Sequence, residues 1–289
     1  MSVIRGDQTL PTLRGDSSPP TVESRTTLDA AGRTDVGLVR SRNEDQFLIA
    51  RLGRWMTIEG ASIPHATREL WTPQGTLLVV ADGMGGQGAG DVASAVVLDT
   101  FAAHSLAEMP WLTFGTPEGD ALLARDLTEI AARCQDRLHE VAERKDLPRR
   151  LGTTFTAVYV HDMRGVVAHV GDTRAYLVRD GSVQRLTRDH TLAADLEALG
   201  HPAAHQNVLT NAIGGTNEKP VVDLVSMQLA SGDRILLSSD GLHGVVDEVT
   251  IARLVWGAKD PREASDALVQ AAIERGAPDN VTAVVASIR

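Results

Sequence analysis

The spacing of apolar and polar residues predicts a chain of short strands and amphipathic helices. Apolar residues run without interruption from Leu77 to Val80, which is typical of a strand buried on both faces. Between residues 118 and 146 they recur at three- and four-residue steps, which predicts a helix with one apolar face. A further helix is predicted over residues 91–109. The buried strand is therefore followed by two helices.

Further strands are predicted from short apolar runs bounded by turn residues. They cover residues 35–40, 46–50, 153–160, 165–170, 174–178, 183–186, 221–229, 233–237 and 281–288. Helices are expected at 191–200, 248–256 and 262–275. Because hairpin turns such as Asp180-Gly181 join neighbouring runs, we expect the block from 153 to 186 to form one antiparallel sheet.

Three segments lack this regularity. Residues 1–28 mix Pro, Ser, Thr and charged residues with few apolar ones, so we predict a disordered tail before a single domain at 29–289. Residues 53–75 are expected to be a surface excursion between paired strands. Residues 191–216 combine the short helix with a Gly- and Asn-containing loop and are predicted to form a mobile flap.

Composition narrows the class of protein. With 289 residues, 43% of them hydrophobic, the chain can bury a large core. A net charge of −10 argues against binding to nucleic acid or to an anionic membrane surface. The single cysteine, Cys134, excludes a disulfide framework and is predicted to be a core residue. No apolar stretch resembles a membrane span or a signal peptide, so we expect a cytoplasmic protein.

Acidic residues occur where predicted strands meet glycine, asparagine or a turn. They are Glu44, Asp45, Asp82, Asp172, Asp240 and Asp279. Any one alone is most simply a turn residue. Together they can converge on one cleft, where their like charges would require a cation. Oxygen ligands without Cys or His at ligand spacing favour Mg²⁺ or Mn²⁺.

The glycines after Asp82 formally match the dinucleotide fingerprint G-x-G-x-x-G between Gly83 and Gly88. A nicotinamide-dependent dehydrogenase is nevertheless disfavoured. The fingerprint requires a second strand ending in an acid about 20 residues later, whereas this stretch is predicted to be helical. Asp82 would also repel a pyrophosphate.

Seven motifs, in order, resemble those of the metal-dependent protein serine/threonine phosphatases, the PPM family, in their bacterial form. They are RSRNED at 40–45, VADGMGG at 80–86, GTT at 152–154, HVGDTR at 169–174, LTNAIG at 209–214, SDG at 239–241 and PDNVT at 278–282. The resemblance extends from Ala30 to the C-terminus. It implies an α+β fold, an α-β-β-α sandwich of two antiparallel sheets flanked by helices.

The resemblance also implies roles for individual residues. Asp82 would bridge two Mn²⁺ or Mg²⁺ ions, and Arg40 would bind the substrate phosphate. The first ion would add the Gly83 carbonyl and Glu44, and the second Asp240 and Asp279, while Asp45 would hold a metal-bound water. The implied reaction is direct attack on the phosphorus of phosphoserine or phosphothreonine by a water that bridges the ions.

Two positions depart from the family pattern. Met84 replaces the histidine that eukaryotic members carry, as it does in bacterial relatives. Gly244 replaces an acid that in many relatives helps to bind a third metal together with the residue matching Asp172. A weaker third site is therefore expected, with His243 as a substitute ligand.

The resemblance implies phosphorylated proteins as partners, namely a serine/threonine kinase or its substrates, and a monomeric enzyme. A catalytically weak pseudophosphatase that acts as a signalling or binding module is the main alternative. The joint presence of Arg40, Asp82, Asp240 and Asp279 argues against it, since binding alone would not require them.

Overall fold

A computed structural model describes residues 28–57, 69–85, 89–108, 117–148, 150–201, 208–215 and 219–289. Residues 1–27 of the predicted tail lie outside the described residues, as do 58–68 of the predicted excursion and 202–207 and 216 of the predicted flap.

Strands and helices occur in separate runs along the chain, which is an α+β arrangement. The strands are β1 (Leu28–Asp35), β2 (Asp45–Thr57), β3 (Glu69–Met84), β4 (Gly152–Thr153), β5 (Phe155–His161), β6 (Arg164–Val170), β7 (Arg174–Arg179), β8 (Ser182–Arg185), β9 (Ile213–Gly214), β10 (Asp223–Gln228), β11 (Arg234–Ser238) and β12 (Val281–Ile288). The helices are α1 (Gly90–Glu108), α2 (Pro117–Arg144), α3 (Leu192–Ala198), α4 (Asp240–His243), α5 (Glu248–Gly257) and α6 (Pro261–Glu274).

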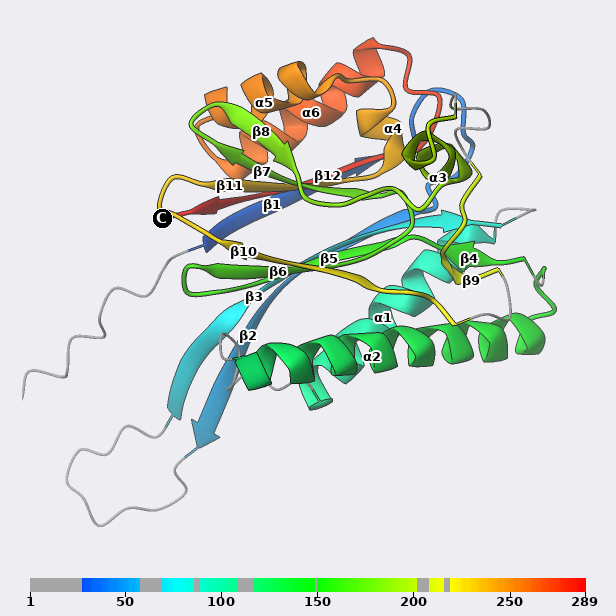
Figure 1. The fold of residues 1–289 in the computed structure, drawn as a ribbon, viewed down its shortest axis with the longest axis horizontal. Helices are drawn as coiled ribbons and strands as arrows, with labels where there is room; N and C mark the ends of the chain where they lie inside the picture. Colours follow the sequence, from blue (N-terminus) through cyan, green and yellow to red (C-terminus); the bar gives the residue numbers. More distant parts are fainter. Residues whose placement is uncertain are drawn as a thin grey trace, which may run out of the picture.

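Two antiparallel sheets pack face to face between layers of helices, as the family resemblance implies (Figure 1). One sheet has the order β1-β12-β11-β7-β8 and is covered by α5 and α6. The other has the order β10-β6-β5-β3-β4-β9, with β2 beside β3, and is covered by α1 and α2. No helix among the described residues is both long enough and apolar enough to cross a bilayer.

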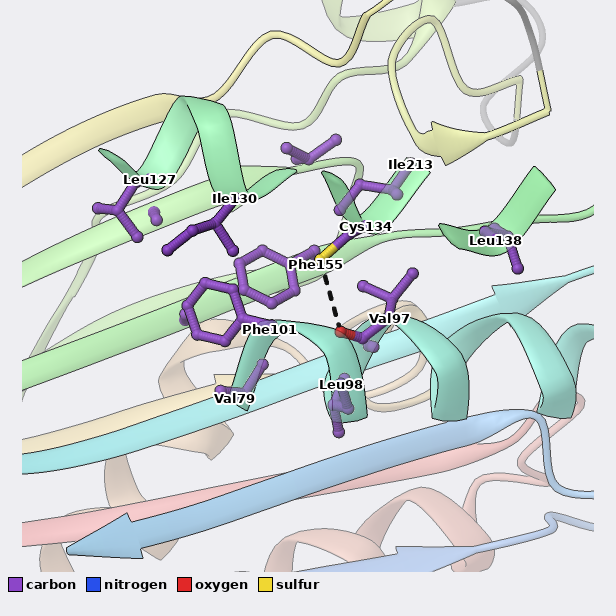
Figure 2. Close-up of a cluster of buried hydrophobic side chains, with 14 of the residues drawn as sticks. Val79, Val97, Leu98, Phe101, Leu127, Ile130, Cys134, Leu138, Phe155 and Ile213 are labelled. Carbon is purple, nitrogen blue, oxygen red and sulfur yellow. Dashed lines mark hydrogen bonds between the residues drawn. The ribbon is translucent and has the colours of Figure 1, made fainter. Parts of the chain in front are cut away.

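Each interface between layers is filled by apolar side chains. Beneath α1 and α2, the Phe101 and Phe155 rings lie with their centroids 4.5 Å apart, and the Cys134 Sγ lies 3.7 Å from the Val97 carbonyl oxygen (Figure 2). Burial raises the pKa of the Cys134 thiol to about 12. The prediction of a core cysteine is confirmed, and such a thiol is a poor nucleophile.

The predicted strand over residues 35–40 is wrong. β1 ends at Asp35 and pairs with β12 from Leu28↔Ile288 to Asp35↔Val281. The chain then turns, because Gly37 has φ +75° and its N–H donates to Asp35 Oδ1 at 3.0 Å. Leu38 is consequently 64% exposed despite the apolar pattern. This turn delivers Arg40 to the end of the sandwich.

The block from 153 to 186 does not form one sheet as predicted. β5 and β6 belong to one sheet and β7 and β8 to the other. The chain crosses between the sheets at Gly171-Asp172-Thr173, where Gly171 has φ +107°. Both pairs of strands are buried, so their apolar patterns look alike and do not reveal the change of sheet.

Other boundaries agree closely with the prediction or extend it. The two long helices, α5, α6 and β12 lie where they are expected. The β2–β3 ladder continues to Thr57↔Glu69, well into the predicted excursion, with a register shift between Leu52 and Gly53. The one-turn helix α4 and the short strand β9 were not predicted, because both are too short to show a period.

Candidate active site

Asp82 lies near the end of β3, directly opposite Asp45 at the start of β2. Its main chain is held on both sides by the Gly-Thr-Thr motif. The Asp82 N–H donates to Thr154 Oγ1 at 2.9 Å, and the Asp82 carbonyl accepts from Thr153 Oγ1 at 2.8 Å and from the Thr154 N–H at 2.9 Å. The strand end is therefore fixed while the carboxyl group faces a cleft.

The cleft has a volume of about 1040 Å³ and gathers almost all of the predicted site residues. Its lining includes Arg40, Glu44, Asp82, Gly83, Asp172, Asp240 and Asp279. They come from separate parts of the fold: the turn after β1, the start of β2, the end of β3, the crossing between sheets, the start of α4 and the turn before β12. Strand-end acids far apart in the sequence thus meet at one end of the sandwich.

Asp45 is the predicted site residue that does not line the cleft. It is 1% exposed, and its Oδ2 accepts hydrogen bonds from Ser239 Oγ at 2.6 Å and Thr282 Oγ1 at 2.7 Å. Its Oδ1 has no hydrogen-bond partner in the described part of the chain. Burial raises the pKa of Asp45 to about 7. Asp45 therefore ties β2 to the segments beside Asp240 and Asp279 and keeps one oxygen available.

Burial and mutual repulsion disfavour the charged form of the acids. Burial first, and then the charges of Asp45 and Asp240, raise the pKa of Asp82 well above its usual value. Burial and the Asp240 charge raise the pKa of Asp172 to about 7. The pKa of Asp240 is raised by burial and by Asp279, and its buried Oδ1 lacks a partner among the described residues. Such a cluster is stabilised by a cation that neutralises it.

The donor set fits hard divalent metal ions, since it offers carboxylate and carbonyl oxygens. No three His, Cys, Asp or Glu side chains among the described residues are already arranged around one ion position. Two of the predicted ligands are engaged elsewhere, because Glu44 Oε1 accepts from the Gly90 N–H at 3.0 Å and Asp279 Oδ2 lies 2.7 Å from Arg40 Nη2. If Glu44 and Asp279 bind metal ions, these contacts with the Gly90 N–H and with Arg40 would be replaced by contacts with the ions.

Gly83 is required where β3 meets α1. A Cβ on Gly83 would lie 2.0 Å from the Gly90 carbonyl oxygen, so any side chain would separate the two main chains. The Gly83 N–H also donates to the Glu44 carbonyl oxygen at 3.1 Å. The Gly83 carbonyl, a predicted metal ligand, is thus placed beside Glu44 by main-chain contacts alone.

Arg40 stands at the exposed rim of the cleft, with 54% of its side chain exposed. The hydrogen bond to Asp279 raises the pKa of Arg40 above its already high value. The guanidinium is therefore permanently charged, and its planar donors match the oxygens of a phosphate.

Asn280 holds the loop that carries Arg40 and Glu44, a role that the sequence pattern does not predict. Its Oδ1 accepts from the Glu44 N–H at 2.8 Å, and its Nδ2 donates to the carbonyls of Val36 at 2.9 Å and Arg42 at 2.8 Å. An asparagine after the strand-end Asp279 is the only local signal, and its partners lie more than 230 residues away in the chain.

His190 was also missed. Its Nδ1 accepts from the Gly171 N–H at 3.1 Å, so its Nε2 carries the proton and donates to Asp223 Oδ2 at 3.0 Å. Asn211 Nδ2 lies 2.9 Å from the same Nδ1. His190 therefore joins the crossing that carries Asp172 to the loop 208–215 and to β10. A lone histidine before a short helix shows no pattern that would predict this.

His243 is not in a position to replace the missing third-site acid. It is not part of the cleft lining, and its Nδ1 lies 3.0 Å from Ser238 Oγ. Burial lowers the pKa of His243 to about 3. The adjacent Gly244 N–H donates to the Asp240 carbonyl at 2.7 Å and closes α4.

The family model described as protein phosphatase 2C matches residues 66–274, which is more than half of the chain. The chain belongs to the protein phosphatase 2C family. This assignment agrees with the PPM resemblance and excludes the dinucleotide interpretation of the glycines after Asp82.

Relatives of the phosphatase 2C family show similarity over most of the chain. The serine/threonine protein phosphatase PstP of Mycobacterium tuberculosis is 33% identical over 267 residues, which cover 89% of this chain and 44% of PstP. The chain thus spans less than half the length of that relative. The serine/threonine phosphatase Stp of Listeria innocua is 30% identical, with 89% of this chain and 95% of Stp covered.

Solved structures share the phosphatase 2C fold. The catalytic domain of PstP in complex with two manganese ions has a TM-score of 0.65 at 32% identity, covering 91% of this chain and 99% of that domain. The S. agalactiae serine/threonine phosphatase has a TM-score of 0.72 at 26% identity, covering 91% and 100%. The two-sheet sandwich is therefore that of the family.

Proposed function

We propose that this chain hydrolyses phosphoserine and phosphothreonine in proteins with the help of two divalent metal ions. One observation carries the proposal: five carboxylates from separate segments meet at a single cleft with Arg40 at its rim. Burial, and after it the neighbouring carboxylates, raise the pKa values of Asp82 and Asp240, and a bound cation would offset both effects. Membership of the phosphatase 2C family supports the same reaction.

The proposed cofactor is Mn²⁺ or Mg²⁺, supported by the oxygen-only donor set and by the two manganese ions of the PstP structure. Asp82 would contact both ions, the Gly83 carbonyl and Glu44 would complete one site, and Asp240 and Asp279 the other. Asp172 would serve a weaker third site. When bound, such ions supply Lewis acidity that activates water for in-line attack on phosphorus.

The chain's own residues bind and orient the substrate. Arg40 is proposed to exchange its contact with Asp279 for the oxygens of the substrate phosphate, which frees Asp279 as a ligand. Asp45 would position a water through its unpartnered oxygen. Met84 lines the cleft but carries no proton to donate, so the leaving alkoxide would be protonated by water.

The proposed partners are phosphorylated proteins, namely a serine/threonine kinase or its substrates. The relatives named as serine/threonine phosphatases support this class of substrate. We further propose that the enzyme acts as a monomer in the cytoplasm, where the single buried cysteine needs no disulfide partner.

The proposal is tested by hydrolysis of a phosphothreonine peptide with Mn²⁺, with chelator, and with the variants Asp82→Ala and Asp240→Ala. Asp136→Ala, an exposed acid on α2, is the matched control. We expect activity that requires the metal, survives in the control and falls by at least about a hundredfold in both site variants. No hydrolysis by a folded, metal-loaded protein would instead favour the pseudophosphatase.

A further inference from the structure

The cleft is larger than the phosphorylated side chain alone requires. Its volume of about 1040 Å³ slightly exceeds the roughly 300–1000 Å³ found for sites that enclose an organic ligand. The acids and Arg40 account for one part of its lining. Much of the remainder is formed by the connection after α2, the loop 208–215 and the segment before β10. Neighbouring residues of a substrate can therefore enter the same cleft.

This second part of the lining carries two exposed cations, Arg150 and Lys219. Neither makes an ion pair or a side-chain hydrogen bond within the part of the chain that the structure describes. Other cations near the site are already paired: Arg40 lies 2.7 Å from Asp279, and Arg174 lies 2.6 Å from Asp189. Arg150 and Lys219 are therefore available to a ligand.

The cleft also continues past Lys219. Val208 and Val221, 50% and 66% exposed, line the same cleft as this cation. Lys219 in turn lines a second hollow of about 520 Å³ between α2 and the segment that contains Pro220 and Leu224. A polypeptide bound at the acids would thus meet a cation and apolar side chains as it leaves over α2.

We propose that Arg150 and Lys219 form a second anion subsite, which binds an acidic or phosphorylated side chain of the substrate close to the phosphoresidue that is hydrolysed. The inference rests on the proposed function and adds a substrate class to it: phosphoproteins with clustered negative charge. Charge-assisted hydrogen bonds from a guanidinium and an ammonium are the chemistry that recognises such groups.

The subsite is tested with phosphothreonine peptides that differ only in one neighbouring residue, taken at each position in turn. That residue is alanine, aspartate or a non-hydrolysable phosphonate analogue of phosphoserine. We expect the wild-type KM to be about 3- to 10-fold lower for the anionic peptides at one or more positions, with kcat little changed, as for exposed ion pairs. The more strongly preferred anion identifies carboxylate or phosphate as the group recognised.

Variants connect the preference to the two cations. Arg150→Ala and Lys219→Ala together should abolish the difference between anionic and alanine peptides, and Lys219→Glu, which leaves the subsite with one charge of each sign, should weaken it more than Lys219→Ala does. Turnover of p-nitrophenyl phosphate should not change. Arg253→Ala, which removes an exposed cation on α5, is the matched control.

Two results would overturn the subsite while leaving the phosphatase assignment intact: equal wild-type KM values for all peptides, or equal losses on anionic and alanine peptides in the double variant. A wild-type protein that hydrolyses no peptide with Mn²⁺ would contradict the proposed function itself. Melting temperatures of all variants establish that they are folded.

Discussion

Two glycines allow the main-chain contacts that bring the acids together. A Cβ on Gly241 would lie 1.9 Å from the Asn280 carbonyl oxygen, and one on Gly83 would lie 2.0 Å from the Gly90 carbonyl oxygen. Gly241 therefore lets α4 approach the start of β12, so that Asp240 and Asp279 can share a cleft. The acids give the site its charge, and the two glycines allow the main chains to approach closely enough for the acids to share one cleft.

Gly241→Ala adds only one methyl group, but it should destabilise the protein and reduce hydrolysis. We expect a loss of about 1–3 kcal/mol in the free energy of unfolding, as for overpacked interiors, and a raised Mn²⁺ requirement because Asp279 is displaced. Gly257→Ala, at the end of α5 with nothing within 4 Å of the added Cβ, is the control. Denaturant unfolding and metal titration check both, and equal effects of the two substitutions would contradict this account.

Single residues differ in how far they could be predicted from the sequence. Asp82 and Asp240 were predicted as site residues because each follows a buried apolar run, which is a local signal. Asn280 and His190 were not, because their importance comes from partners distant in the chain. His243 was proposed as a ligand from its sequence neighbourhood alone, yet its side chain contacts Ser238 outside the cleft lining.

At the scale of elements, the junctions between strands and helices form the site. The crossing from β6 to β7 carries Asp172 from one sheet to the other, and His190 connects this crossing to the loop 208–215. Thr191 and Leu209 form an isolated β-bridge beside this connection. The loop is thus attached to the crossing through a side chain and a short main-chain pairing.

His190→Ala should release the loop from the crossing. The Gly171 N–H and the Asp223 carboxylate would each lose a partner, so we expect a loss of about 1–3 kcal/mol in stability. KM for a phosphopeptide should rise several-fold more than KM for p-nitrophenyl phosphate, since the loop lines only the outer cleft. His139→Ala on α2 serves as the control. Parallel changes in KM for the two substrates would indicate general destabilisation instead.

The sequence predicts the positions of the elements more accurately than their arrangement in the two sheets. Periodicity located α2, α6 and β12 within a few residues, because it records which side chains are buried. It did not reveal that β6 and β7 belong to different sheets, because burial of a strand does not specify its hydrogen-bonding partner. The four-layer arrangement came from the family resemblance, which the comparisons confirm.

At the scale of the whole molecule, the metal-free protein keeps a cluster of acids that resist ionisation. The pKa values of Asp45 and Asp172 are both about 7 in the folded protein, against about 3.9 in an unfolded chain. Between these pH values the folded state holds protons that the unfolded state has lost. These groups therefore make their full contribution to the free energy of unfolding below about pH 4, and that contribution is lost as pH rises through about 7.

With chelator present, Asp172→Asn should gain stability relative to wild type between about pH 5.5 and about pH 8, by about 1–3 kcal/mol. Burial lowers the pKa values of His169 and His243 to about 4 and about 3, so these histidines change the free energy of unfolding with pH in the opposite direction. Their contribution is the same in the variant and in wild type, so it cancels in the comparison. Stabilisation by Mn²⁺ should be greater at the higher pH, because ions bind the deprotonated carboxylates. Thermal unfolding measures the effect of the substitution and the effect of Mn²⁺. A stability difference between Asp172→Asn and wild type that does not change with pH would contradict the raised pKa of Asp172.

The pairing of β1 with β12 joins Leu28 to Ile288, the two ends of the described chain. A ribosome releases these segments in order, so β1 waits for its partner until the roughly 250 residues between the two strands have been made. Asp279 emerges equally late. A nascent chain can thus form the helices α1 and α2 early, but the cleft assembles only after β12 has emerged. The same long-range pairing makes folding slow compared with a helical protein of equal size, and a chain that ends before β12 has neither Asp279 in place nor an assembled cleft.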